Sequence, residues 1–350
     1  MVDLPPYPVV RQRKRRYFTL VLLVVLLVGG WIGFWYYAEG KIEQSIEGWK
    51  AREARAGRLY DCGSQTVGGF PFRFEVLCNN VKATLTKSHP PADLTAPQIH
   101  VAAQVYDPTL LIAEVAGPVT YAEPGQPPSY VANWTLAQSS VRGTPREPER
   151  VSVVIDGLNV KHVGGTDEPV ADAERLEVHG RMLEGSAQAN PVIEIVVRST
   201  KLAAPVLGAM AAKPTDSDVD VVLRGLKDFS PKPWPDRFRE LAQTGGQLEI
   251  RRARIEQGDT LAVGSGTLTV RADGKLDGQL NVTIAGAEAL INDVLAANKN
   301  RLGFSMSIGL GLLGGGKKLE GRPAISLPLR LRDGHAYLGP LKFADVPPLF

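Results

Sequence analysis

The sequence predicts a mainly β protein with a few short helices, in which a single N-terminal transmembrane helix precedes a long, curved antiparallel sheet. Three observations support this fold class. Residues 17–37 form an uncharged apolar run, apolar and polar residues alternate in short segments from Val81 onward, and Gly, Pro and Asp separate those segments. Alternation with a period of two is typical of strands that have one apolar face. Two packed sheets are the alternative arrangement of the same strands.

Residues 17–37, YFTLVLLVVLLVGGWIGFWYY, are the predicted membrane span. About 21 residues without a charge rise about 31 Å as a helix, which is enough to cross the hydrocarbon core of a bilayer. Basic residues precede the span, and aromatic rings near its end favour the opposite interface. These flanking residues are Arg11, Arg13, Lys14, Arg15, Arg16, Trp31 and Trp35. The pattern predicts a cytoplasmic tail over residues 1–16 and a body across the membrane.

The span is expected to remain as an uncleaved signal-anchor. A cleaved signal peptide has an apolar region of about 7–15 residues followed by an A-x-A-like site, and the sequence Tyr36-Tyr37-Ala38 lacks the second small residue. The pair Arg15-Arg16 also resembles the core of a twin-arginine export signal. General secretion and twin-arginine export therefore both remain open as the route.

The charge balance gives no indication of a nucleic-acid partner. Lys and Arg together number 40 and Asp and Glu 37, and residues 1–16 account for the positive excess. The basic character therefore belongs to the flank of the span, and the rest of the chain is close to neutral.

Cys62 and Cys78 are the two cysteines of the chain, and both follow the span closely. In an oxidising compartment they are expected to form a structural disulfide that contributes about 3 kcal/mol. Two free buried thiols and half of a metal site are the alternatives. The chain has no further cysteine to complete a zinc site, and no histidine lies nearby in sequence.

Residues 38–57 are predicted to extend the span as a helical stalk. Ile42, Ile46 and Trp49 form one narrow apolar stripe, and Gly57 is a plausible helix end. The antiparallel β body is expected over residues 58–350, with a sub-boundary near 203–245. Within it, helical spacing is found at Pro235–Gln243, Leu202–Ala212 and Ala287–Asn298.

Two Asp-Gly turns allow predictions of strand register, because directly paired residues share a face. In the first hairpin a three-residue loop, Asp273–Lys275, would place Ala272 opposite Leu276 and Leu268 opposite Leu280. A loop with an odd number of residues is therefore expected there.

In the second hairpin the apolar residues occupy odd-numbered positions before Asp333-Gly334 and even-numbered positions after it. A tight two-residue turn is therefore expected, with Leu331 opposite Ala336.

The motifs that could carry chemistry are weak. Gly309–Gly314 match G-x-G-x-x-G and Gly311–Lys317 match most of a P-loop, but Lys318 stands at the Ser/Thr position and Gly321 and Pro323 interrupt any following helix. The five histidines are scattered without metal-binding spacing, and no G-x-S-x-G is present. We expect no catalytic, cofactor-binding or metal-binding residue, no cofactor, and no enzymatic activity.

Two segments resemble domain-of-unknown-function family 2125: residues 57–78, with the pattern GR-Y-D-C-G followed by GGFPFR-F-E-V-L-C, and residues 333–341 at the C-terminal end. The resemblance covers nearly the whole chain. It implies a bacterial inner-membrane anchor and a periplasmic body, and it carries no reaction and no catalytic residues. The repeated pattern over Gly266–Val282 is similar to strands of AsmA-like envelope proteins, which are associated with lipid homeostasis and transport.

Three functions are compatible with this architecture. The first is a periplasmic protein that binds a phospholipid or other apolar ligand on a β groove, if the apolar strand face is open rather than capped. The second is an envelope assembly or scaffold protein that acts through protein partners. The third is an exported enzyme without a recognisable motif.

Overall fold

The computed structural model describes residues 13–88, 90–144, 147–164, 168–230, 232–286, 318–338 and 341–350. The predicted helix over residues 287–298 and the glycine-rich segment Gly309–Lys317 lie outside these described residues, as does His89.

One continuous helix, α1 (Arg13–Arg55), contains both the predicted span and the predicted stalk. It is long and apolar enough to cross a membrane by length and composition, and its apolar side chains from Tyr17 to Leu27 are exposed. The helix ends at Arg55, and Gly57 follows with a φ of +82° and donates its amide to the Ala54 carbonyl at 3.0 Å. A glycine adopts this left-handed conformation without the steric cost that a side chain would add.

Eighteen strands in the described part of the chain form one sheet, and every pairing is antiparallel. The strands are β1 (Arg58–Gly68), β2 (Arg73–Leu85), β3 (Ala92–Gln104), β4 (Asp107–Ala116), β5 (Val119–Ala122), β6 (Tyr130–Asn133), β7 (Leu136–Thr144), β8 (Glu147–His162), β9 (Pro169–Ser186), β10 (Ala189–Leu202), β11 (Thr215–Arg224), β12 (Gln247–Gln257), β13 (Thr260–Val270), β14 (Leu276–Ala285), β15 (Lys318–Leu319), β16 (Arg322–Arg332), β17 (His335–Leu338) and β18 (Leu341–Asp345). The predicted mainly β class is confirmed, and the strands form a single sheet rather than two packed sheets.

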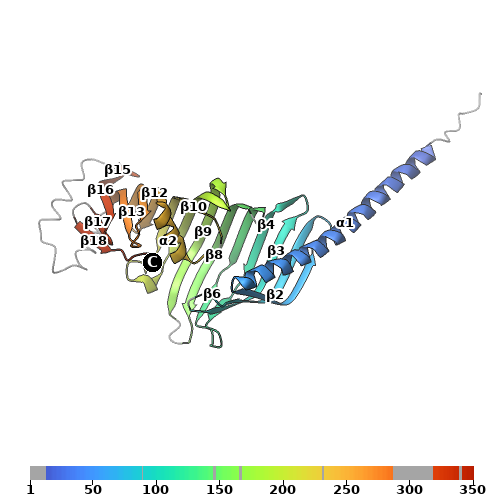
Figure 1. The fold of residues 1–350 in the computed structure, drawn as a ribbon, viewed down its shortest axis with the longest axis horizontal. Helices are drawn as coiled ribbons and strands as arrows, with labels where there is room; N and C mark the ends of the chain where they lie inside the picture. The colour runs from blue at the N-terminus through green and yellow to red at the C-terminus, as the bar shows by residue number, and fades with distance from the viewer. Residues whose placement is uncertain are drawn as a thin grey trace, which may run out of the picture.

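The sheet is a meander, in which strands that follow one another in sequence are neighbours in space. Its long axis runs from α1 at one end to β15–β18 at the other (Figure 1). β4 and β5 pair with different parts of β3, so together they occupy one strand position in the sheet. In the same way β6 and β7 pair with different parts of β8 and together occupy the next position. β11 pairs with β10 on one side and β12 on the other, so the sheet continues through the region 203–245, where a sub-boundary was predicted.

A second helix, α2 (Trp234–Thr244), confirms the helix predicted over Pro235–Gln243. Its Leu241 is 1% exposed and packs with Ile193, Leu226 and Val270 in a core cluster. The C-terminal residues Leu349 and Phe350 pack against the same cluster, which places the end of the chain beside α2 (Figure 1).

The helix predicted over Leu202–Ala212 is wrong in extent. Only the single 3-10 turn η1 (Pro205–Leu207) forms, and Gly208 follows it with a φ of +114°. Pro205 lacks an amide proton, and Gly208 leaves the helical region, so an α-helix cannot continue through these positions.

The hairpin between β16 and β17 confirms the predicted two-residue turn. Leu331 pairs with Ala336 and Arg332 with His335. Asp333 and Gly334 have φ values of +54° and +81°, as a type I′ turn requires at both central positions.

The hairpin between β13 and β14 confirms the predicted odd loop but corrects its position. The Arg271 amide donates to the Lys275 carbonyl at 2.8 Å, so the loop is Ala272–Gly274. Leu268 consequently lies opposite Gly278 instead of Leu280. The third position of such a loop requires a positive φ, and Gly274 adopts one of +76°. The prediction had placed Lys275 at this third position in order to pair apolar residues, and the backbone requirement outweighs that pairing.

Candidate functional site: an apolar face across the sheet

The strand register aligns apolar residues in rows across the sheet, because directly paired residues project from the same face. From β2 to β16, one row contains Val76, Val101, Ala113, Ser139, Val153, Val178, Val197, Val219, Ala253, Gly264, Val282 and Leu327. The neighbouring row contains Phe74, Ala103, Leu111, Val141, Val151, Gly180, Ile195, Val221, Ile250, Gly266, Leu280 and Leu329. We call these two rows the apolar face. Ser139 is the one polar residue among them.

The opposite face of the sheet is charged. Arg181 in β9 pairs with Glu194 in β10 at 2.6 Å. Glu177 accepts a hydrogen bond from His179 at 3.0 Å and another from Arg175 at 2.5 Å. These two contacts, with that of His179 the larger, lower the pKa of Glu177 to about 2. The sheet therefore separates an apolar face from a face of paired charges.

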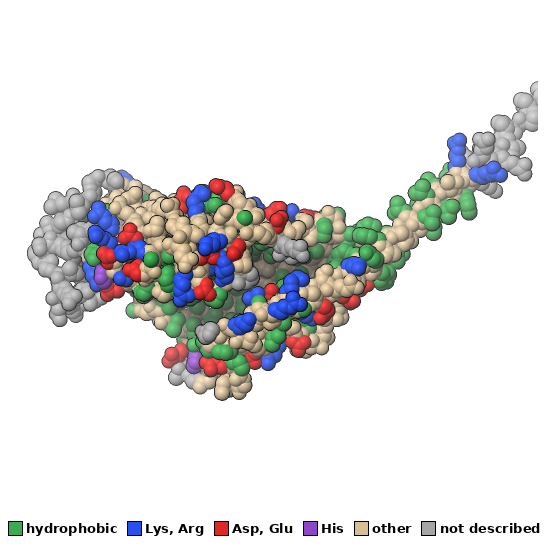
Figure 2. All heavy atoms as spheres, viewed as in Figure 1, with side chains coloured by type: hydrophobic (Ala, Val, Ile, Leu, Met, Phe, Trp, Pro, Cys, Tyr) green, Lys and Arg blue, Asp and Glu red, His purple; other side chains and the backbone are tan. Residues whose placement is uncertain are grey.

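The apolar face is covered towards both ends and open between them. At the first end Trp35 of α1 stacks on Phe74, with ring centroids 5.6 Å apart. Towards the other end α2 packs over Ile193 and its neighbours. Between them Val178 is 36% exposed, and Val153 and Val197 are half-buried. Figure 2 shows this region as a hollow lined by hydrophobic side chains, with charged side chains along both rims.

A pocket of about 560 Å³ lies where the open part of the apolar face meets α2. Its floor is formed by residues of the apolar face such as Val153 and Ile195, and α2 contributes Trp234, Phe238 and Leu241. This volume is within the range of roughly 300–1,000 Å³ that small-molecule sites occupy. The lining suits an apolar ligand.

Ion pairs hold α2 and the loop before it over the sheet. Lys232 contacts Asp228 at 3.0 Å and Glu240 at 2.8 Å, and the buried Arg237 guanidinium contacts both carboxylates. Hydrogen bonds from Ser230 and then Lys232 hold the pKa of Asp228 well below its usual range. Burial opposes ionisation of Glu240, but hydrogen bonds from Lys232 and the Lys227 amide prevail and lower its pKa. Each charge of this network has a partner, so the network is a structural support.

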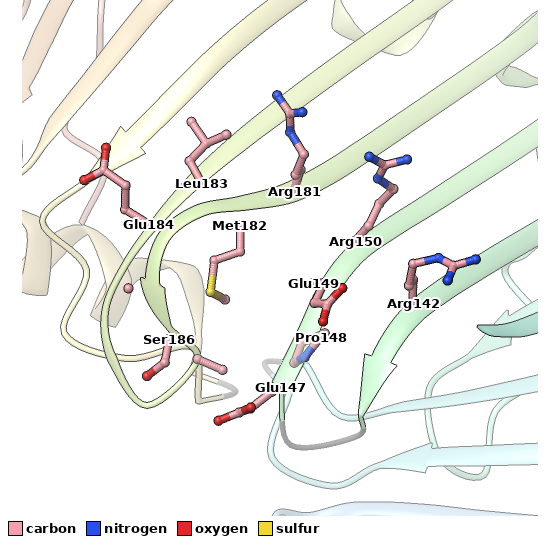
Figure 3. A pocket seen from close by; sticks show the side chains of 12 residues that line it. Arg142, Glu147, Pro148, Glu149, Arg150, Arg181, Met182, Leu183, Glu184 and Ser186 are labelled. Atoms are coloured by element: carbon pink, nitrogen blue, oxygen red, sulfur yellow. The ribbon is translucent and has the colours of Figure 1, made fainter. Parts of the chain in front are cut away.

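A second pocket, of about 660 Å³, lies at the ends of β7, β8 and β9 and has a mixed, charged lining. Arg142, Arg150 and Arg181 are directly paired across these strands and point the same way (Figure 3). Arg142 contacts Asp107 at 3.4 Å, whereas no ion pair reaches Arg150 from the part of the chain that the structure describes. Glu147, Glu149 and Glu184 also line this pocket, so its charges largely balance.

The GGFPFR segment forms the turn between β1 and β2, and α1 docks on it. Trp31 Nε1 donates to the Pro71 carbonyl at 3.1 Å, and Trp35 Nε1 lies 3.4 Å from the Arg73 carbonyl. Trp35 is 3% exposed, so it faces protein rather than the membrane interface where it was expected. Phe72 precedes β2 and belongs to the turn, whereas Phe74 lies within the strand.

The two cysteines lie on this same hairpin. Cys62 in β1 and Cys78 in β2 form a disulfide, with Cα atoms 5.5 Å apart. Of the predicted basic flank, Arg15 and Arg16 are exposed at the start of α1, whereas Arg11 and the side chains of Arg13 and Lys14 lie outside the described parts of the chain.

The histidines that pair with carboxylates in the described residues lie apart from one another. His100 lies near Glu75, His179 near Glu177 and His335 near Asp345, at three separate places on the sheet. Within the described ranges no group of three His, Cys, Asp or Glu residues is arranged to hold a metal ion.

Sequence reasoning found the alternation within single strands but not the two rows that cross them. Those rows depend on the register between neighbouring strands, and across a long connection such as the one that contains η1, between β10 and β11, no tight turn sets that register. It also missed the contact between α1 and the turn. The available signal was the spacing of Trp31 and Trp35, which lie on one helix face four residues apart.

Comparison with known proteins supports the assignment that the two end motifs suggested. No curated protein matches the chain, and the similarity of Gly266–Val282 to AsmA-like strands therefore stays a prediction. A family model described as "Uncharacterized protein conserved in bacteria (DUF2125)" matches residues 35–347, which include the GGFPFR turn, the apolar face and α2. The chain belongs to the DUF2125 family of bacterial proteins.

Proposed function

We propose that this protein is anchored in the bacterial inner membrane by α1 and that its periplasmic sheet binds a phospholipid or another apolar ligand on the apolar face. The observation that carries the proposal is the register: two rows of apolar residues continue across the sheet while their central part stays open. Soluble proteins rarely leave a contiguous apolar surface exposed unless it binds something.

The dimensions of the apolar face suit a chain-like ligand. Each row crosses the sheet from β2 to β16, and strands spaced about 4.8 Å apart give a path of roughly 50 Å. An extended hydrocarbon chain lying along the open central part of the rows would contact mainly aliphatic side chains, and it would reach the pocket beside α2.

The placement of the body outside the cytoplasm rests on two features. The basic flank precedes the span, which favours a cytoplasmic N-terminus. The Cys62–Cys78 disulfide is typical of an oxidising compartment such as the periplasm.

A binding role is proposed rather than a catalytic one. The open face consists mainly of aliphatic side chains, whereas Glu177 with His179 and Glu194 with Arg181 are paired on the opposite face. A general acid or base has to reach the reacting group directly.

The proposal is tested by native mass spectrometry of the full-length protein after mild detergent extraction. We expect co-purified phospholipid on the wild type and its loss in a variant carrying Val153→Gln and Val178→Gln, because two amides would then lie on the open face. The matched control carries Val154→Gln and Val196→Gln, which place the same groups in β8 and β10 on the opposite face.

A lipid-free wild type, or equal lipid occupancy in both double variants, would contradict the lipid-binding role. A protein partner bound at fixed stoichiometry in place of lipid would support the scaffold function instead.

A further inference from the structure

The turn between β1 and β2 has a fixed position relative to the membrane helix. Trp35 packs edge-on against Phe70, with ring centroids 5.5 Å apart, and the Trp31 indole binds the Pro71 carbonyl. Further along α1, Trp49 stacks on Tyr60 of β1 at 4.8 Å. Two separated contacts hold α1 against one hairpin, so the depth of the helix in a bilayer also sets the depth of the turn.

That depth lies within the predicted span. From Tyr17 to Trp31 the helix rises about 21 Å, and a hydrocarbon core of about 30 Å then ends near Tyr37. Pro71, which lies beside Trp31, is therefore about 9 Å inside the far boundary of the core. The turn and the last residues of the span occupy the same layer.

The side chains at this position are aromatic and exposed. Phe70 is 50% exposed and Phe72 67% exposed. The Val105 amide donates to the Phe72 carbonyl at 3.0 Å, which brings the β3–β4 turn alongside with Tyr106 at 77% exposed. Aromatic side chains are enriched where proteins enter the membrane interface. Figure 2 shows hydrophobic side chains continuing from α1 onto the adjoining edge of the sheet.

Protein groups satisfy four backbone carbonyls of the turn. The carbonyls of Gly69, Pro71, Phe72 and Arg73 all have donors, from the Arg73 amide, Trp31, the Val105 amide and Trp35. Pro71 has no amide proton to satisfy. Irregular backbone is tolerated at membrane depth when protein groups satisfy it in this way.

We propose that the tips of the β1–β2 and β3–β4 turns, with Phe70, Phe72 and Tyr106, insert into the membrane leaflet nearest the body. The inference rests on the proposed anchor function of α1. Arg73 and Asp107 directly follow the aromatic residues and limit the insertion to the tips. The apolar face begins at Phe74, next to this turn and stacked on Trp35, so insertion places its first residue near the boundary of the membrane.

The test uses the full-length protein in nanodiscs of a synthetic phospholipid, with a photoreactive benzoylphenylalanine at one position at a time. The positions are Phe72, Leu27 in the span and Leu207 in η1, a side chain that is 78% exposed on a different connection. We expect cross-linked lipid at Phe72 in a yield like that at Leu27, and only background at Leu207. The Phe72 product should persist in the Val153→Gln and Val178→Gln variant, because insertion does not require a bound ligand.

Background yield at Phe72 with normal yield at Leu27 would overturn the insertion while leaving the anchor intact. Background at both positions would overturn the anchor and the inference with it. A Phe72 product that disappears in the Val153→Gln and Val178→Gln variant would show lipid on the apolar face rather than bilayer, and would also overturn the insertion.

Discussion

Replacing Trp35 with alanine is expected to release the β1–β2 turn from α1. Trp35 lies about 27 Å along the helix from Tyr17, near the far boundary of the expected span, so the released ring would meet interfacial water. Removing about 200 Å² of tryptophan surface from water, at about 25 cal/mol per Å², corresponds to about 5 kcal/mol. Part of that area is already hidden in the undocked chain, and the 3.4 Å hydrogen bond to Arg73 is long. We therefore expect a loss of about 4 kcal/mol, which is within the usual range for tryptophan-to-alanine changes in cores.

Amide hydrogen exchange in nanodiscs measures this loss where it occurs. The Arg73 amide is bonded to Gly69 and the Val105 amide to Phe72, so both should exchange faster once the turn opens. A loss of about 4 kcal/mol corresponds to roughly a thousandfold lower protection. The control is Tyr37→Ala, which removes an exposed aromatic side chain from the same helix. Protection of Arg73 and Val105 that is the same in both variants would refute a docking energy of this size.

Three further predictions concern the stability of the sheet. Leu241→Ala should lower the free energy of unfolding, measured by denaturant titration, by about 3 kcal/mol. The three buried carbons that are removed contribute about 2.4 kcal/mol, and the adjoining pocket limits the additional cost of the cavity. A loss under about 1 kcal/mol would contradict this packing. Reduction of the Cys62–Cys78 disulfide, which joins residues 16 positions apart, should lower the free energy of unfolding by about 3 kcal/mol. The same reducing treatment should not change the stability of a control variant with serine at both positions. Glu177 has a pKa lowered from 4.5 to about 2, so its stabilising contribution is complete above pH 4.5 and is lost as the pH falls through about 2. Glu177→Gln should therefore flatten the stability profile in that pH window, and an unchanged acid profile would contradict the assigned contacts.

Features set by a few adjacent residues could be predicted from the sequence. The prediction of a two-residue turn at Asp333-Gly334 was correct, because the positive φ angles that these residues adopt and the positions of the flanking apolar residues favour the same turn. The other loop, Ala272–Gly274, lies one residue before its predicted position. There the pairing of apolar residues and the backbone requirement of Gly274 favour different positions, and the backbone requirement is decisive. Local chemistry is therefore a better guide to turns than apolar pairing alone.

Features that depend on distant residues could not be predicted in the same way. Trp35 has the composition of an interfacial anchor, and only its contacts with Phe70 and Phe74 show that it faces protein. The open state of the apolar face likewise depends on where α2 packs, and the periodicity of the strands contains no information about that position. The candidate site therefore required the three-dimensional register.

The meander has a consequence for how the chain folds. Each strand pairs with a neighbour that is close in sequence, from β1 with β2 to β17 with β18, so the sheet has few contacts that must wait for a distant segment. Such local topologies fold faster than sheets with long crossovers, since the loops to be closed are short. After α1, hairpins can add one after another to a growing edge in the order in which they are synthesised. Leu349 and Phe350 pack beside α2 against residues of β10 and β13, so this contact can form only after those strands are in place.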